Sequence, residues 1–221
     1  PMQALPEDYA AFSAIDDPQR RVFGGMLKSL DESVGALRGA LAERGLGENT
    51  LVFFLSDNGG PTAELTSTNL PLRGTKGSLY EGGLRVPMLA AWPGVFRAGD
   101  VFEEPIWSLD FTATALSAAG GTVPREWGGD DLRPWITGDL RGERGARTFD
   151  WRMGSKAALR SGDLKIVRHR PTEAWELYDL AADPTESRNL AAERPAAVAT
   201  LRTIWQTRER QMVPPRDVKS R

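Results

Sequence analysis

Two oxygen-bearing side chains follow the first strongly apolar run of the sequence. Residues 51–55 read Leu-Val-Phe-Phe-Leu, and Asp57, Asn58 and two glycines come directly after Ser56. A short run rich in Val and Phe predicts a strand buried on both faces, as in a parallel sheet covered by helices. Ligands of open α/β sheets bind outside the carboxyl ends of the strands, and calcium and magnesium take carboxylate and amide oxygens. The pattern predicts either a metal site or a tight turn, because the same residue types dominate turns.

A second candidate for chemistry is Lys76, which lies in a glycine-rich stretch over residues 71–87. The lysine ammonium is a compact point charge that can face an anion beside a metal and stabilise charge that develops in a transition state. The competing interpretation is a solvated surface lysine in a loop. In the same stretch, Glu81 and Arg85 are expected to pair with each other and hold the loop.

Other polar residues favour structural roles. The only histidine, His169, has no serine or carboxylate near it in the sequence that suggests a catalytic triad, so we expect it on the surface or in a turn. The pairs at 16–17 and 130–131 are both Asp-Asp, but neither follows a clear apolar strand. We interpret both pairs as loop charges.

The composition is ordinary for a globular protein and excludes several classes of site. Of the 221 residues, 40% are hydrophobic and 26% are charged, with a formal net charge of −2. This charge predicts no general affinity for nucleic acid or anionic membranes. The chain has no cysteine, which excludes disulfides, zinc–thiolate sites and a cysteine nucleophile within it. No apolar run approaches the roughly 18 residues of a membrane span.

The first 120 residues predict alternating helices and strands. Apolar residues recur in steps of three and four over 19–44, which predicts an amphipathic helix whose apolar stripe covers a sheet. Residues 51–55 and 86–92 predict strands. Ser108 or Asp110 is a candidate cap for a helix that reaches Ala119 and stops at two glycines.

The remainder predicts a smaller unit. Residues 121–147 are rich in Gly, Pro and charge and are typical of a connection. Short strands are predicted at 148–151, 157–160, 164–168 and 176–180, with a turn at Gly162-Asp163. A final helix is predicted over 195–212, and a frayed tail over 213–221. The expected fold class is α/β: part of a mixed sheet flanked by helices, followed by a small antiparallel sheet with a helix.

Taken in order, these motifs resemble the sulfatase family of the alkaline-phosphatase-like superfamily. The resemblance rests on Leu-Ser-Asp-Asn-Gly-Gly at 55–60, Pro-Leu-Arg-Gly-Thr-Lys-Gly-Ser-Leu-Tyr-Glu-Gly-Gly-Leu-Arg-Val-Pro at 71–87 and Trp-Pro-Gly at 92–94. Near the end, Lys-Ile-Val at 165–167, Glu-Leu-Tyr-Asp-Leu at 176–180, Asp-Pro-Thr-Glu at 183–186 and Asn-Leu at 189–190 add to it. The resemblance therefore extends over nearly the whole chain.

The resemblance implies hydrolysis of sulfate esters at one divalent cation, usually calcium. Asp57 and Asn58 match two metal ligands, and Lys76 matches the lysine that contacts the sulfate. It also implies that residues 1–120 are the C-terminal portion of the α/β core domain, 121–147 a connecting segment, 148–212 the small C-terminal subdomain and 213–221 a flexible tail. Export to the periplasm or the cell exterior is common in the family, but no residue here assigns a location.

The remaining parts of the family's site lie N-terminal to these motifs. They include two further metal-binding aspartates and the Cys- or Ser-x-Pro-x-Arg motif, whose first residue becomes formylglycine. This sequence contains no such motif, so it resembles the C-terminal half of a sulfatase. We expect the isolated chain to be inactive, to bind calcium weakly and to self-associate, with the N-terminal half of the same protein as its partner.

The residues leave two alternatives open. One is a phosphodiesterase or phosphonate hydrolase of the same superfamily, which the absent nucleophile motif would distinguish. The other is a non-catalytic fragment. The substrate is expected to be a sulfated small molecule or glycan, and its identity is not encoded in these motifs.

Overall fold

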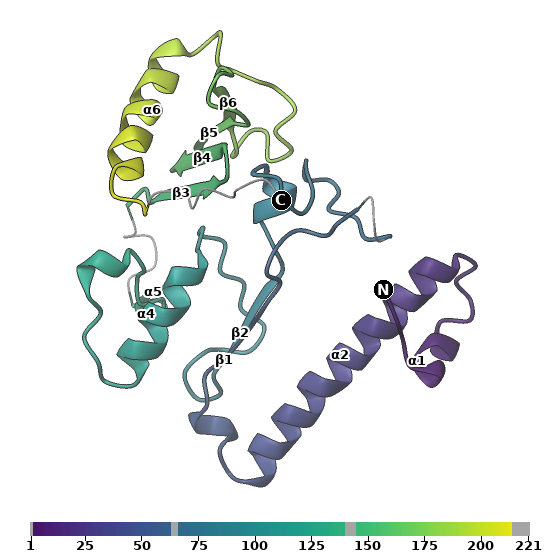
Figure 1. Ribbon diagram of the computed structural model, residues 1–221. Coiled ribbons are helices and arrows are strands. Elements are labelled where there is room, and N and C mark those ends of the chain that lie inside the picture. Colours follow the sequence, from purple (N-terminus) through teal and green to yellow (C-terminus); the bar gives the residue numbers. More distant parts are fainter. Residues whose placement is uncertain (1, 63–65, 140–144, 214–221) are drawn as a thin grey trace. The chain divides into compact units, whose positions relative to one another are not determined.

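The computed structural model describes residues 2–62, 66–139 and 145–213, and it divides into two compact units (Figure 1). Unit 1 comprises residues 1–68 and 86–144, and unit 2 comprises residues 69–85 and 145–221. The stretch that contains Lys76 thus groups with the C-terminal residues, although it lies between the strands of unit 1 in the sequence. Most of the predicted tail lies outside the described residues.

Unit 1 begins with two helices that pack against each other, α1 (Pro6–Ala11) and α2 (Pro18–Glu43). The side chain of Asp17 caps α2 by accepting a hydrogen bond of 2.8 Å from the backbone N–H of Arg20. Gly25 lets α1 and the residues before it approach closely, because a Cβ at this position would lie 2.8 Å from the Cβ of Ala4 and 3.2 Å from the backbone N of Tyr9. Lys28 of α2 then pairs with the buried carboxylate of Asp8 at 2.6 Å.

The apolar stripe of α2 is not buried as the periodicity predicts. The helix itself is confirmed almost to the residue, but Leu27, Leu30 and Leu37 are 50%, 47% and 59% exposed. Periodicity reports which side chains would gain from burial, and it cannot supply the surface that covers them. Helix α2 therefore presents an uncovered apolar face within the described part of the chain.

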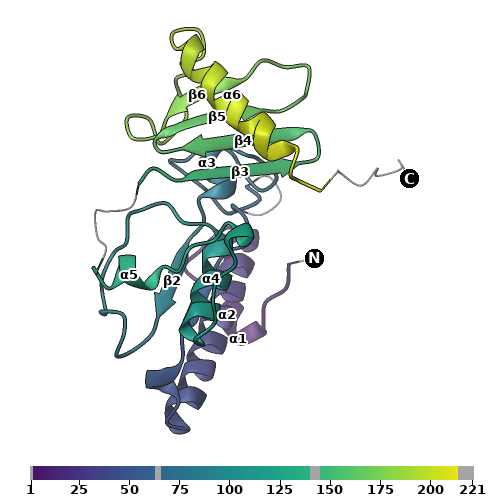
Figure 2. The ribbon, with the colours of Figure 1, turned by 90° about the vertical axis from the view of Figure 1, so that its left-hand side faces the viewer.

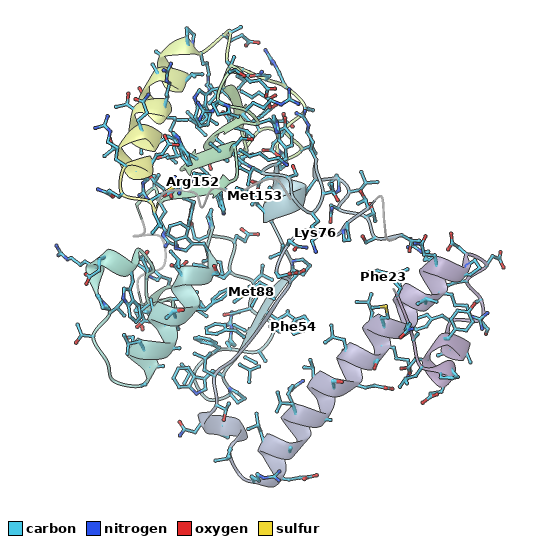
Figure 3. All side chains as sticks on the ribbon, viewed as in Figure 1. Phe23, Phe54, Lys76, Met88, Arg152 and Met153 are labelled. Carbon is cyan, nitrogen blue, oxygen red and sulfur yellow. The ribbon has the colours of Figure 1, made fainter. Side chains whose placement is uncertain are left out.

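The strand before Asp57 is confirmed, but its predicted surroundings are wrong. Strand β1 (Val52–Leu55) follows the short 3-10 helix η1 (Gly47–Asn49) and pairs antiparallel with β2 (Met88–Ala91). Phe54 is 37% and Leu89 69% exposed, so the sheet is not buried on both faces. Figure 3 labels Phe54 and Met88 on this two-stranded sheet.

Helix α4 (Ser108–Ala118) packs on β1 through stacked rings of Phe53 and Phe111, whose centroids lie 4.8 Å apart. The N-cap residue is Trp107 rather than Ser108 or Asp110. Asp110, three residues further on, stabilises the helix start by accepting from the backbone N–H of Trp107 at 3.1 Å. Its other oxygen accepts from the N–H of Asp130 at 2.8 Å, so one aspartate fixes both the helix start and the following loop. The 3-10 helix η2 (Arg125–Trp127) and α5 (Arg133–Ile136) complete the unit.

Unit 2 contains the predicted antiparallel sheet. Its strands run in sequence order: β3 (Thr148–Met153), β4 (Lys156–Ser161), β5 (Leu164–Arg168) and β6 (Glu176–Asp179). The β4–β5 hairpin turns at Gly162, whose φ of +59° suits glycine. All four predicted strands are confirmed.

This sheet is covered on both faces. On one face, Leu159, Ile166 and Leu177 pack against Leu201 and Trp205 of α6 (Pro195–Glu209), which lies across the strands in Figures 1 and 2. On the other face, Leu79 and Tyr80 pack against a second set of buried residues, namely Ala158, Val167, Tyr178 and Leu180. The short helix α3 (Glu81–Leu84) follows directly on Leu79 and Tyr80.

The hydrophobic cores of the described residues lie in unit 2. Its two clusters contain most of the fully buried apolar side chains, whereas unit 1 contributes only Ala113 and Leu132 among those described. Most of the exposed large apolar side chains belong to unit 1. No helix among the described residues is long and apolar enough to cross a membrane.

Candidate functional site

The end of β1 presents the two predicted metal-ligand candidates, Asp57 and Asn58. The hydroxyl of Ser56 donates to the backbone O of Asn58 at 2.8 Å, and the side-chain NH2 of Asn58 donates to the backbone O of Gly59 at 3.0 Å. These bonds form a turn, and they leave the amide oxygen of Asn58 without a hydrogen bond in the described part of the chain. Asp57 is exposed, and its carboxylate has no protein partner there.

This arrangement suits a hard cation, although it supplies only part of a site. Calcium takes six to eight oxygen ligands, and Asp57 and Asn58 are two candidates. Among the described residues, no three His, Cys, Asp or Glu side chains cluster as a metal site would require. A turn and a ligand pair are therefore compatible interpretations, because the turn hydrogen bonds use neither the Asp57 carboxylate nor the Asn58 amide oxygen.

Lys76 stands on a loop that is closed against α3. An added Cβ at Gly82 would lie 2.5 Å from the backbone O of Gly74, and one at Gly83 would lie 2.2 Å from the backbone O of Ser78. Only glycine fits these approaches, which gives the Glu-Gly-Gly motif a physical reason. The loop is further held by the hydrogen bond from the N–H of Gly82 to the O of Arg73 at 2.7 Å.

The ammonium of Lys76 is available to a ligand. Lys76 is exposed, and within the described ranges its side chain forms no hydrogen bond or ion pair; Figure 3 shows it on the loop that precedes α3. A lysine whose backbone is held in place and whose ammonium has no partner is suited to binding an anion.

Glu81 fastens this loop to the C-terminal sheet through a buried ion cluster. The ammonium of Lys165, on β5, lies 2.7 Å from one carboxylate oxygen of Glu81 and 2.8 Å from one of Glu186. The Lys165 and Glu186 side chains are 0% exposed and that of Glu81 6%. Glu186 also accepts from the backbone N–H of Glu81 at 2.6 Å. The predicted Glu81–Arg85 ion pair is wrong, because the buried lysine is the partner of the carboxylate.

Two buried carboxylates share one ammonium in this cluster, so negative charge is in excess. Burial disfavours the charged form and raises the pKa of Glu186 above its ordinary value of 4.5, in spite of the opposing attraction of Lys165. Sequence reasoning missed Lys165 and Glu186 as partners. One signal was present: Lys165 is a lone charge inside the apolar run Leu164–Val167, and a charge that is buried with such a run needs a partner.

The raised pKa predicts an unusual pH dependence for Glu186→Gln. Between the unfolded-state pKa and the raised folded-state pKa, the folded protein binds more protons, so the free energy of unfolding of the wild type falls as pH rises. Glutamine does not titrate, so the variant should gain stability relative to the wild type as pH rises from the ordinary glutamate pKa of 4.5 to the raised folded-state pKa of Glu186. Urea unfolding across this range measures the difference. The exposed Glu193→Gln is the control, and parallel pH curves for wild type and Glu186→Gln would contradict the interpretation.

A second polar network surrounds Arg73 on the same face of the sheet. Its guanidinium lies 3.9 Å from the ring centroid of Tyr80 and donates to the hydroxyl of Tyr178 at 2.9 Å. Both tyrosine hydroxyls donate to one oxygen of Glu176, at 2.6 Å and 2.7 Å. Burial, together with these bonds to the carboxylate, raises the pKa of Tyr178 to about 12 and raises that of Tyr80 as well.

The network also gives His169 a defined role. Its Nε2 lies 2.8 Å from the hydroxyl of Tyr80, and this hydroxyl already donates to Glu176. Nε2 must therefore carry a proton and donate. The histidine lies in a bend after β5, in agreement with the predicted turn, and it is half-buried rather than on the surface. Its contact is with Tyr80, and it does not form part of a triad.

The predicted site residues divide between the two units. Asp57 and Asn58 are adjacent at the end of β1 in unit 1, and Lys76 belongs to unit 2. Unit 1 holds the two candidate ligands at a strand end, and unit 2 holds Lys76 on a loop that is attached to the C-terminal sheet.

Known proteins match the chain in sequence. Residues 2–121 match the sulfatase family, and residues 75–211 match the family described as N-sulphoglucosamine sulphohydrolase, C-terminal. Human arylsulfatase A is 35% identical over 199 residues, which cover 77% of this chain and 39% of that protein. A sulfatase of Formosa agariphila is 28% identical over 89% of this chain and 40% of its own length. The chain thus spans about two fifths of these relatives.

The fold agrees with solved structures. The crystal structure of Ps i-CgsB superposes with a TM-score of 0.82 and 30% identity, over 94% of this chain and 47% of that one. The sulfatase PsFucS1 from Pseudoalteromonas sp. gives a TM-score of 0.71 at 24% identity, over 94% of this chain and 45% of that one, which supports the fold alone. The match over residues 2–121 and the 35% identity to arylsulfatase A show that the chain belongs to the sulfatase family.

Proposed function

We propose that this chain is part of a sulfuric ester hydrolase that cleaves an aryl or carbohydrate sulfate at a calcium site. The observation that carries the proposal is a set of three groups at the family's motif positions that have no partner among residues 2–62, 66–139 and 145–213. These are the Asp57 carboxylate, the amide oxygen of Asn58 and the Lys76 ammonium.

Each residue has one role in this proposal. Asp57 and Asn58 hold the cation through their oxygens, and the cation when bound supplies Lewis-acid neutralisation of the sulfate oxygens. Lys76 contacts a sulfate oxygen and stabilises the charge that grows on the sulfate during bond cleavage. The loop around Gly82 and Gly83 keeps the lysine in place before the substrate arrives, so little reorganisation is needed.

The nucleophile is proposed to come from outside these 221 residues. The sequence contains no cysteine and no Ser-x-Pro-x-Arg motif, so the chain has no residue that matches the formylglycine position. The uncovered apolar side chains of α2, β1 and β2 support the same proposal, because they suit a missing N-terminal half as their covering surface.

The substrate class follows from the relatives. Curated relatives include arylsulfatase A, steryl-sulfatase and N-acetylgalactosamine-6-sulfatase, and Ps i-CgsB was crystallised with k-i-k-neocarrahexaose. We propose a sulfated small molecule or glycan for this chain. The phosphonate monoester hydrolase SpPMH shares the fold at a TM-score of 0.67 and 22% identity, so phosphonate hydrolysis remains the second activity to assay.

The test compares the 221-residue protein with the product of the coding sequence extended upstream of Pro1. We expect the 221-residue protein to show no turnover of 4-nitrophenyl sulfate and only weak calcium binding by calorimetry, because two ligands leave most of the coordination shell to water. The extended product should hydrolyse the sulfate ester faster than a 4-nitrophenyl phosphonate. Turnover by the 221-residue protein alone would overturn the proposal. A preference for the phosphonate would favour phosphonate hydrolysis over sulfate-ester hydrolysis.

A further inference from the structure

A pocket of about 590 Å³ opens in unit 2 beside the β5–β6 connection and the first turns of α6. Its volume lies within the usual range for small-molecule sites. None of the residues discussed above as sulfate or metal ligands lines it. Its polar lining comes from Arg168, Arg202 and Glu173, and the remainder is apolar apart from backbone groups.

Arg168 is held in position within the pocket lining. Its guanidinium carbon lies 4.7 Å from the ring centroid of Trp175, and Trp175 packs edge-on against Trp205 at 5.9 Å. The Nε–H of Arg168 is shielded from solvent and has no acceptor in the described residues. A buried donor without an acceptor is unfavourable, so the hydrogen-bonding capacity of this guanidinium is not fully used within the described residues.

The charge balance of the lining favours an anion. Arg202, from the second turn of α6, has no ion pair among the described residues and is exposed. The single acid of the lining, Glu173, already faces Arg170, whose Nε lies 3.7 Å from its carboxylate. Two arginines therefore face the pocket with no carboxylate committed to either. The first turn of α6 also lines the pocket, so the positive end of the helix macrodipole lies beside it.

The rest of the lining sets the shape of the ligand. Pro171, Ala192, Pro195 and Val198 provide a small apolar wall next to the arginines. Such a wall suits the C–H face of a sugar ring, whereas a free inorganic ion would leave it without a partner. Trp175 is 8% exposed and engaged by Arg168, so it supports the arginine instead of stacking on the ligand.

We propose that this pocket is a second binding site that takes the sulfate group of a sulfated saccharide through Arg168 and Arg202, with the ring against the apolar wall. The choice of a sulfated saccharide rests on the proposed sulfatase function, whereas the preference for an anion rests on the pocket alone. The site would hold a sulfate that is not being hydrolysed, as polysulfated glycans offer.

Calorimetry and NMR titration of the 221-residue protein test the proposal with galactose 6-sulfate, galactose and inorganic sulfate as probes. We expect galactose 6-sulfate to bind, with shifts at Trp175 and Val198, and to bind at least about tenfold more tightly than either other probe. Arg202→Gln should weaken this binding by about tenfold. Arg38→Gln, which removes the same charge from an exposed position on α2, should leave it unchanged.

Two further variants test the second arginine and the independence of this pocket from Lys76. Arg168→Met keeps the stem over Trp175 and should also weaken binding if the protein stays folded, which circular dichroism checks. Lys76→Ala should have no effect, which separates this pocket from the proposed sulfate contact. Unchanged affinity in both arginine variants would overturn the site, and equal affinity for inorganic sulfate would overturn the saccharide assignment. Neither result depends on turnover. The binding site can therefore be confirmed even if the proposed sulfatase activity is wrong, and the activity can be confirmed even if the binding site is wrong.

Discussion

Lys165→Met is expected to lower the free energy of unfolding by about 3–5 kcal/mol, the loss typical of a buried ion pair that is broken by removing one partner. The Lys165 side chain is 0% exposed and neutralises the carboxylates of Glu81 and Glu186 at 2.7 Å and 2.8 Å. Methionine fills most of the volume but leaves two buried acids facing each other. At neutral pH these acids either repel or take up protons, and both outcomes weaken the fold.

Chemical unfolding monitored by tryptophan fluorescence measures this loss in unit 2, where Trp175 and Trp205 lie in the core. The matched control is Lys156→Met on the neighbouring strand, whose ammonium donates only to the backbone O of Gly77. That change should lower the free energy of unfolding by about 1 kcal/mol.

The carboxylates provide a second check on the same cluster. Adding Glu81→Gln and Glu186→Gln to Lys165→Met removes every charge, so the triple variant should recover part of the loss. If Lys165→Met unfolds no more easily than Lys156→Met, or if the triple variant is less stable than the single one, the ion cluster does not hold the loop to the sheet.

Lys76→Ala is expected to lower kcat/KM for a sulfate ester by about 10²–10³-fold in the complete enzyme, the usual loss when one group that stabilises transition-state charge is removed. Because Lys76 is exposed and its side chain is unpaired among the described residues, the free energy of unfolding should stay the same. Steady-state kinetics of the upstream-extended product measures the loss. Arg38→Ala, at an exposed position of α2, is the control for removal of a positive charge.

Asp57→Asn separates the lysine role from the metal role. Loss of one carboxylate weakens a calcium site by removing charge while it keeps an oxygen ligand, so added calcium should restore part of the activity. Calcium should not restore Lys76→Ala. If excess calcium rescues both variants equally, or if Lys76→Ala retains full activity, the assigned roles are wrong.

The sequence alone determined the order and type of most elements. The periodicity over 19–44, the four short runs from 148 onward and the turn at Gly162 all appear in the structure, because local pattern and turn chemistry act within a few residues. It also placed Asp57, Asn58 and Lys76 as candidates, through residue types that recur at family motifs. The chemical roles of these residues remain proposals, and the structure shows the backbone and the hydrogen bonds around each of them.

Only the tertiary structure shows which contacts hold the Lys76 loop to the C-terminal sheet. Lys165 is 84 positions from Glu81, and Glu81 is 105 positions from Glu186. Local pattern cannot identify partners at these separations, because strand pairing and the fold of residues 69–85 bring them together. For the same reason, the sequence could not show that the apolar stripe of α2 and the faces of β1 and β2 lack a covering layer within the described residues. Periodicity states what a side chain requires, and only the packed structure shows whether that requirement is met.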